Sequence, residues 1–224
     1  METLLPAPTV TPGPKPVAGI HGNPTTADWI LQADVMQRLD FGVIFGNSNP
    51  VEMELGAGDG SFLIQRAAAE PQRNFIGVER LLGRLRKLDR KARRAGLSNV
   101  RCLRLEASYV LEWMVPVGGI SALHIYFPDP WPKRRHWKRR LVNDLLPSVA
   151  HVALSPGGLV LLRTDHTGYF EAMVAAFAGH AGFQRVPTPP DLPGLLTDFE
   201  REFNAQGIPT NHAAYQRLDS TPAR

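Results

Sequence analysis

Apolar and polar positions follow two different periods along the chain from residue 51 onwards. Short apolar, β-prone runs predict buried parallel strands, and the longer stretches between them place apolar residues at helical spacing. This order is typical of βαβ units, so we predict an α/β fold with a mostly parallel, seven-stranded sheet and helices on both faces. The expected strands are Val51–Leu55, Asn74–Val78, Val100–Leu105, Ser121–Phe127, Leu159–Arg163, Gly182–Val186 and Ala213–Leu218. The expected helices are Ser61–Ala69, Leu81–Ala95, Ser108–Trp113, Lys138–Leu154 and Gly168–Gly179.

The N-terminal region has a different composition. Residues 1–26 contain six prolines among several Gly and Thr residues, a composition that cannot build a helix or a sheet interior and predicts a flexible or extended tail. From Ala27 to about Leu39, apolar residues fall near helical spacing, and Thr26 can cap a helix start. We therefore expect a short helix that leads into one domain spanning residues 27–224.

Composition narrows the class of protein. The only cysteine, Cys102, excludes an internal disulfide and any Cys-rich zinc or iron–sulfur site, and the seven histidines show no metal-ligand spacing, so no metal is expected. No apolar run approaches the roughly 20 residues that cross a bilayer, and a signal peptide is missing, which favours the cytoplasm. The pI near 9.5 and the clustering of Lys and Arg favour an anionic partner, first of all nucleic acid. The sequence favours neither a monomer nor a homodimer.

A glycine-rich loop follows the first expected strand. Gly56, Gly58 and Gly60 let the backbone turn tightly and approach a ligand closely, but the third glycine comes one residue too early for the G-x-G-x-x-G dinucleotide fingerprint. With Glu54 before it, Glu54-Leu-Gly-Ala-Gly-Asp-Gly resembles the first motif of class I methyltransferases that use S-adenosylmethionine. The resemblance implies that Glu54 and the three glycines bind this cofactor. A carboxylate at that place complements its cationic sulfonium and amino groups.

Two further carboxylates end the next expected strands. Glu79 lies some 20 residues past the glycine loop, where an acid can accept hydrogen bonds from two ribose hydroxyls. Glu106 precedes Ala107 at the place where the family shows Asp or Asn at the adenine end of the cofactor, and Glu is one methylene longer. The alternative interpretation of each acid is a solvent-facing strand end.

The fourth expected strand runs into a loop rich in proline and then into a cluster of cations. Pro128, Pro130 and Pro132 fix three φ angles, so Asp129 is expected on a stiff, non-helical loop. Ligands of open α/β sheets bind outside the carboxyl ends of the strands, which places this loop on the functional face. The alternative is a proline-stiffened turn that leads into a solvated helix. Six cations lie within eight residues, at Lys133, Arg134, Arg135, Lys138, Arg139 and Arg140.

The same stretch carries a closer resemblance. Phe127-Pro-Asp-Pro-Trp-Pro-Lys-Arg-Arg-His-Trp-Lys-Arg-Arg-Leu-Val142 is similar to the signature of the tRNA (guanine-N7)-methyltransferase family, as are Val51–Glu79, Pro156-Gly-Gly158, Thr164-Asp165 and Thr197-Asp-Phe-Glu200. The resemblance implies a Rossmann-like methyltransferase fold and methyl transfer from S-adenosylmethionine to N7 of a guanosine in the variable loop of tRNA.

The resemblance also implies roles for individual residues. Asp129 matches the catalytic acid, which either stabilises charge arriving on the guanine, holds the guanine N1–H and amino group, or grips the amine of the cofactor. Thr197 and Glu200 match one substrate contact, with a helix N-cap and its capping-box acid as the alternative. The other implied contacts with substrate or RNA are Lys133, Arg135, Lys138, Arg139, Arg140 and Asp165.

Two interpretations stay open at this point. The second expected helix carries Arg84, Arg86, Lys87, Arg90, Lys91, Arg93 and Arg94 against only Asp89, and it forms either a wider RNA footprint or a solvated face. The alternative to an enzyme is a non-catalytic RNA-binding protein with a methyltransferase-like fold, although the intact glycines, Glu79 and Asp129 favour catalysis.

Overall fold

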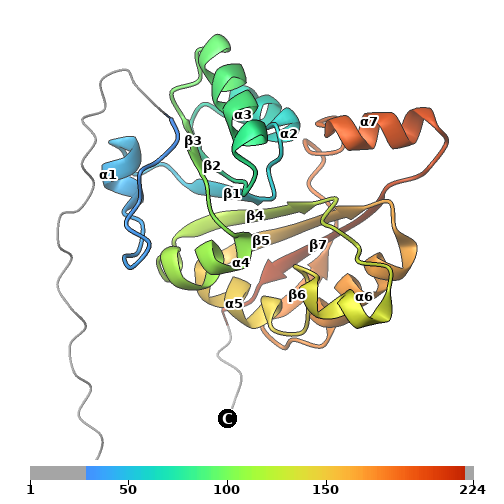
Figure 1. Ribbon diagram of the computed structural model, residues 1–224. Coiled ribbons are helices and arrows are strands. Elements are labelled where there is room, and N and C mark those ends of the chain that lie inside the picture. Colours follow the sequence, from blue (N-terminus) through green and yellow to red (C-terminus); the bar gives the residue numbers. More distant parts are fainter. Residues whose placement is uncertain (1–28, 220–224) are drawn as a thin grey trace, which may run out of the picture.

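The computed structural model describes residues 29–219, so the tail predicted at 1–26 lies outside the described residues. One sheet of seven strands has the order β3-β2-β1-β4-β5-β7-β6 (Figure 1). All neighbours pair in parallel except β7, which is antiparallel to both β5 and β6. The strands are β1 (Val51–Leu55), β2 (Asn74–Val78), β3 (Val100–Leu103), β4 (Ile120–Tyr126), β5 (Leu154–Thr164), β6 (Phe183–Val186) and β7 (Asn211–Arg217). The seven predicted strands are thus confirmed, with β5 starting five residues earlier than expected.

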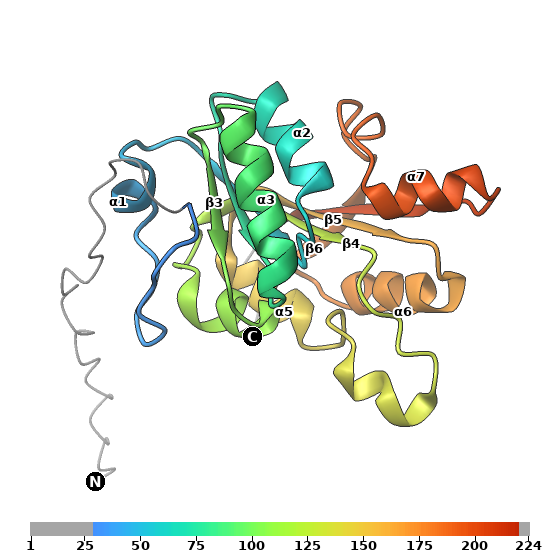
Figure 2. The same ribbon diagram turned by 45° about the horizontal axis from the view of Figure 1, so that its top comes forward.

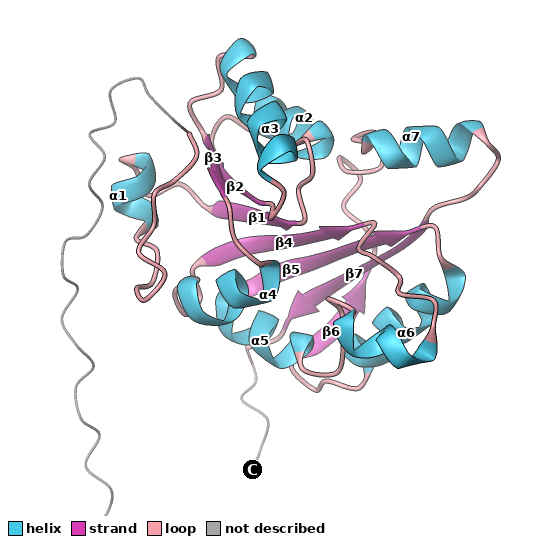
Figure 3. Ribbon diagram, viewed as in Figure 1, coloured by secondary structure: helices cyan, strands magenta, loops and turns pink. Residues whose placement is uncertain are grey.

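Helices cover both faces of the sheet, as Figure 3 shows by secondary structure. On one face, α2 (Ser61–Ala69) and α3 (Leu82–Arg94) lie side by side over β1, β2 and β3 (Figures 1 and 2). Leu85, Leu88 and Ala92 of α3 pack there against Phe75 and Val100. On the other face lie α4 (Ala107–Tyr109), the π-helical turn η1 (Val110–Met114), α5 (Leu146–Ala153) and α6 (Thr167–Ala178). The predicted two-faced α/β architecture is confirmed.

The helix predicted over residues 27–39 is wrong for the part that the structure describes. Instead of forming a helix, the start of the segment pairs with the edge strand β3. Cys102 N donates to Trp29 O at 2.7 Å, and Leu31 N donates to Cys102 O at 2.8 Å. Trp29, Ile30 and Leu31 are half-buried along this edge and Leu39 is buried, whereas Val35 and Met36 are exposed. The helix begins later, as α1 (Phe41–Phe45), where the Asp40 side chain accepts a hydrogen bond from Val43 N.

The long helix predicted over Lys138–Leu154 is also wrong. Two short helices stand in its place, the 3₁₀ helix η2 (Arg134–Arg139) and α5. Asn143 explains the break, because its Oδ1 accepts from Leu145 N at 2.9 Å and Leu146 N at 3.2 Å, which offers the backbone an alternative to a continuous helix. The helical turn expected near Thr197 is present as α7 (Asp198–Ala205). None of the helices within residues 29–219 combines the length and apolarity that crossing a bilayer requires.

Candidate active site

Two adjoining cavities lie at the carboxyl ends of the central strands. The strand-end cavity, of about 300 Å³, is bounded by Gly56, Glu79, Glu106, Asp129 and Arg139 among others. The glycine-loop cavity, of about 270 Å³, is bounded by Glu54, Gly56, Gly58, Thr197 and the first turn of α7. Gly56, Arg84, Tyr126 and Phe127 line both cavities. The predicted site residues that line neither cavity are Gly60, Lys133, Arg135, Lys138, Arg140, Asp165 and Glu200.

The glycine loop owes its shape to left-handed backbone at Gly56 and Gly60, each with φ of 78°. A Cβ on Gly56 would meet no atom within 4 Å, so the backbone there borders open space that a ligand can approach. A Cβ on Gly60 would lie 2.5 Å from Leu88 Cγ, so this glycine lets α3 pack closely behind the loop. The two glycines therefore serve different purposes.

Glu79 links the end of β2 to the glycine loop. Its carboxylate accepts hydrogen bonds from Leu81 N at 2.7 Å and Gly58 N at 3.1 Å, and the residue is buried. A carboxylate has about four acceptor positions, so roughly two remain for a ligand. The arrangement suits a ligand that offers neighbouring hydroxyl groups.

Glu54 is the unusual acid of the site. It is 3% exposed, and its Oε2 has no hydrogen-bond partner within residues 29–219. Burial raises the pKa of this carboxyl to about 8, against the attraction of Arg163 and with the help of Asp59 and Glu79. A buried acid with an unpaired oxygen beside a cavity favours a cationic ligand, because a cation would supply the missing partner. The sulfonium and amino groups of S-adenosylmethionine fit that requirement.

Glu106 caps α4 at the rim of the strand-end cavity. Its Oε2 accepts from Ser108 Oγ at 2.6 Å and from Tyr109 N at 2.9 Å. Partial burial acts to raise its pKa, but the hydrogen bonds from Ser108 and the backbone outweigh that effect and lower it. The carboxylate of Glu106 is thus engaged in holding the start of α4.

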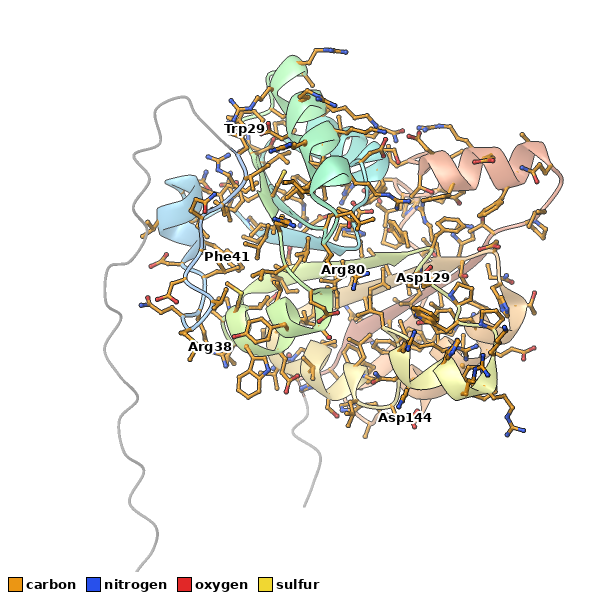
Figure 4. All side chains as sticks on the ribbon, viewed as in Figure 1. Trp29, Arg38, Phe41, Arg80, Asp129 and Asp144 are labelled. Carbon is orange, nitrogen blue, oxygen red and sulfur yellow. The ribbon has the colours of Figure 1, made fainter. Side chains whose placement is uncertain are left out.

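Asp129 lies on a constrained loop after β4. Phe127 and Trp131, on either side of it, have φ of 50° and 42°, values that aromatic residues rarely adopt. Asp129 is exposed, lines the strand-end cavity together with Arg80, and forms no ion pair or hydrogen bond with the described part of the chain. Figure 4 labels Arg80 and Asp129 near the carboxyl ends of the strands. The loop therefore presents a free carboxylate to the cavity.

The predicted cation cluster divides in two. Lys133, Arg135, Lys138 and Arg139 are exposed, as expected for groups that meet a polyanion. Arg140 is 8% exposed, and its Nε donates to Pro130 O at 2.7 Å. This placement does not support the predicted RNA contact of Arg140, since its guanidinium turns inward.

Aromatic rings complete the enclosure of Arg140. The guanidinium carbon lies 4.6 Å from the ring centroid of Tyr169 and 4.7 Å from that of Trp137. Trp137 itself is 44% exposed and also lies under Arg134 at 5.6 Å. Arg140 thus joins the Asp129 loop to η2 and α6.

Thr197 and Glu200 also differ from the simplest expectation. Thr197 is the N-cap of α7, with its Oγ1 accepting from Glu200 N at 3.0 Å. Glu200 is 1% exposed and does not complete a capping box, because its carboxylate pairs with Arg163 Nη1 at 3.0 Å. Asp165, just past the end of β5, is half-buried. The N-cap interpretation is confirmed for Thr197 alone.

Arg163 was not singled out in the sequence, yet it organises one wall of the site. Besides Glu200, it donates to Leu192 O and Leu195 O, each at 2.7 Å. These bonds hold the segment before α7 against β5, which places Thr197 beside the glycine loop. The sequence did give one indication, because Arg163 ends an apolar run. Arginine is rarely buried in a strand unless its charge is paired.

A buried network of polar side chains behind the cavities was also not predicted from the sequence. His124 Nδ1 lies 2.8 Å from the Tyr126 hydroxyl, and His124 Nε2 lies 2.9 Å from Glu52, which also pairs with Arg66. Burial would raise the pKa of Glu52, but His124 and Arg66 lower it to about 2. This network fixes Tyr126, which lines both cavities. Its signal was Glu and His at interior positions of apolar strands.

No group of three or more His, Cys, Asp or Glu within residues 29–219 is arranged to hold a metal ion.

The sheet order, the glycine loop and the acids at successive strand ends define a class I S-adenosylmethionine-dependent methyltransferase. Among solved structures, the 16S rRNA methyltransferase KamB matches with a TM-score of 0.57 at 20% identity, covering 81% of this chain and 93% of that chain. An antibiotic-related methyltransferase matches with a TM-score of 0.56 at 17% identity, covering 79% and 90%. These likenesses confirm the predicted fold.

Sequence comparison identifies the family. A family model described as putative methyltransferase matches residues 48–213. A tRNA (guanine-N(7)-)-methyltransferase of Syntrophotalea carbinolica is 39% identical over 173 residues, covering 75% of this chain and 74% of the relative. One of Streptomyces coelicolor is 33% identical over 197 residues, covering 85% and 72%. The chain belongs to the tRNA (guanine-N(7)-)-methyltransferase family.

Proposed function

We propose that this protein methylates N7 of a guanosine in the variable loop of tRNA, with S-adenosylmethionine as the methyl donor. The observation that carries the proposal is the free carboxylate of Asp129 at a cavity bounded on one wall by Gly56 and Glu79 and on another by Arg139. The family to which the chain belongs supports it.

The chain offers separate groups to separate parts of the donor. Glu79 has acceptor positions left that would take the ribose hydroxyls, and the unpaired Oε2 of Glu54 would complement the positive charge of the donor. Glu106 and Ala107 line the cavity at the end of β3 and would border the adenine. When bound, the donor supplies an electrophilic methyl group on a sulfonium.

The reaction places modest chemical demands on the protein. Guanine N7 carries a lone pair and no proton, so the protein needs no general base. It must hold N7 in line with the methyl group, and such orientation is worth up to roughly 7–11 kcal/mol. Methylation makes the guanine cationic, and the Asp129 carboxylate stabilises that charge as it develops. The stiff backbone around Asp129 keeps the carboxylate in place without further reorganisation.

The cations after Asp129 hold the RNA. Lys133, Arg135, Lys138 and Arg139 are exposed and neutralise phosphates, with release of counterions. Guanine N7 lies in the deep groove of A-form RNA, which side chains enter poorly, so the target base is splayed out or in a loop. Thr197, which lines the glycine-loop cavity, and Asp165, just past the end of β5, contact the substrate, whereas Glu200 acts through Arg163 and α7.

A methyl-transfer assay tests the proposal. Labelled donor is incubated with unmodified tRNA transcripts, and a transcript that lacks the variable-loop guanosine is the control. We expect 7-methylguanosine only in the transcripts that contain the variable-loop guanosine. We expect Asp129→Ala to lower kcat by at least about 100-fold while its tRNA affinity stays within about threefold of wild type. Donor binding without any 7-methylguanosine would favour a non-catalytic RNA-binding protein instead.

A further inference from the structure

A third hollow lies beside the active site, between α3, the end of β3 and the N-terminal segment. We call it the α3 groove; it has a volume of about 670 Å³, more than twice that of the strand-end cavity. Leu105 lines both hollows, so the groove adjoins the site. Its lining includes Arg86, Asp89 and Arg90 of α3 and Arg104 beyond β3.

The groove is positively charged. Arg86, Arg90 and Arg104 are exposed along it, and neither Arg86 nor Arg90 forms a hydrogen bond or ion pair within residues 29–219. The one acid in the lining, Asp89, is occupied, because Arg93 Nε donates to its two carboxylate oxygens at 3.0 and 3.1 Å. Two guanidinium groups therefore stand in the groove without a counter-charge from the described chain.

The cations also have a regular spacing. Arg86 and Arg90 are four residues apart on α3, so their backbones are separated by about 6 Å along one face of the helix. Arg104 continues the row toward the site, where its Nε donates to Arg80 O at 3.5 Å. Arg80 in turn lines the strand-end cavity, and Figure 4 labels it near Asp129. A row of cations thus runs from the α3 groove to the cavity that holds Asp129.

We propose that the α3 groove binds the ribose–phosphate backbone of the tRNA substrate at a distance from the target base. The groove lies at β3 and Asp129 follows β4, three strand positions away, which is about 14 Å. Only a ligand longer than one nucleotide spans that distance, and RNA carries phosphates in a row that suits bidentate arginines. The inference rests on the proposed function, since it assumes that the polyanion in the site is RNA.

Salt-dependent binding tests the proposal. For the double variant Arg86→Ala/Arg90→Ala, we expect tRNA affinity at 150 mM salt to fall roughly tenfold. The slope of log K against log salt should decrease in magnitude by about 1.5. The matched control is Arg185→Ala, which removes an exposed arginine from β6 at the opposite end of the sheet. It should leave both quantities unchanged. Unchanged affinity and slope in the double variant would overturn the proposal.

A crosslink locates the RNA directly. The only cysteine, Cys102, is 0% exposed, and burial raises the pKa of its thiol to about 12, so an introduced cysteine is the reactive one. Arg90→Cys and the control Arg185→Cys are labelled with a photo-crosslinker and irradiated with bound tRNA. We expect a crosslink to RNA from the first variant only. Equal yields from both variants would contradict the groove as an RNA site.

The two proposals fail in different ways. A wild-type protein that makes no 7-methylguanosine refutes the proposed function, whatever the groove binds. Normal methylation by the wild type, together with unchanged tRNA KM in the double variant, refutes the groove proposal alone. If the groove instead binds an acidic protein, the double variant would keep its tRNA KM but would no longer bind that protein.

Discussion

Arg140 offers a sharp test of how the Asp129 loop is held. Its sequence context predicts a phosphate ligand, yet the guanidinium donates to Pro130 O at 2.7 Å, directly after Asp129. We therefore expect it to act as a positioning residue. Arg140→Lys is the informative change, because lysine keeps the charge that a phosphate needs but loses the planar fork and the stacking.

The magnitude follows from the contacts. A hydrogen bond from a charged donor is worth about 1.5–3 kcal/mol, and each cation–π contact with Tyr169 or Trp137 adds about 0.5–1 kcal/mol. Lysine recovers part of this, so we expect a net loss of about 2 kcal/mol in the free energy that keeps the loop ordered. Such a loss lowers the equilibrium constant for the ordered loop by roughly 30-fold, and kcat by up to that factor.

Single-turnover methylation and filter binding separate the two roles. We expect Arg140→Lys to lower the rate of methyl transfer while tRNA affinity and its salt slope stay within error. Arg135→Lys, at an exposed cation of the same cluster that lines neither cavity, is the control and should change neither quantity. If Arg140→Lys retains full activity while Arg140→Met flattens the salt slope, Arg140 is an RNA contact and our reasoning is refuted.

Three other predictions concern stability, each measured by chemical or thermal unfolding. Burial raises the pKa of Glu54 to about 8, so ionisation penalises the folded state as pH rises from about 4.5 to 8. Glu54→Gln should become more stable relative to wild type by on the order of 3 kcal/mol between pH 5 and 8; a constant difference would contradict this. The pKa of Glu52 is instead lowered to about 2, so its stabilisation is present above pH 4.5 and disappears toward pH 2. Glu52→Gln should flatten that acid transition, and an unchanged profile would refute the assignment. Gly60→Ala should lower the free energy of unfolding by about 2–4 kcal/mol, because φ at Gly60 is 78° and the added Cβ would meet Leu88. The control is Gly83→Ala in α3, whose Cβ would meet nothing within 4 Å, so it should be neutral or stabilising.

The parts of the fold that depend on local pattern could be predicted from the sequence. Buried parallel strands are rich in apolar residues, and Glu79 and Asp129 could be placed because each follows such a run. Glu54 could be placed because it directly precedes the glycine loop. The segment from residue 29 to 39 could not, because its extended form depends on the free edge of β3, which is more than 60 residues away. Local spacing of apolar residues does not distinguish a helix from a strand that pairs with a distant edge.

Whether an individual charged side chain is buried or exposed could not be predicted from the sequence either. Arg140 and Arg139 are neighbours with the same chemistry, and only the positions of Tyr169 and Pro130 decide that one is buried and the other exposed. Glu200 is similar, since its partner Arg163 lies 37 residues earlier. Burial of these two charges depends on partners that the fold brings together, so the sequence around Arg140 and Glu200 does not indicate it.

The position of β7 in the sheet bears on how the protein is made. β6 has no neighbour other than β7, because β7 lies between it and β5. During synthesis β6 leaves the ribosome before β7, so it waits with both edges unpaired until some 30 further residues have been added. The antiparallel pairing of β7 with β5 and β6 can therefore form only after the other strands have been synthesised, and we predict that translational pausing before residue 211 prolongs an aggregation-prone intermediate.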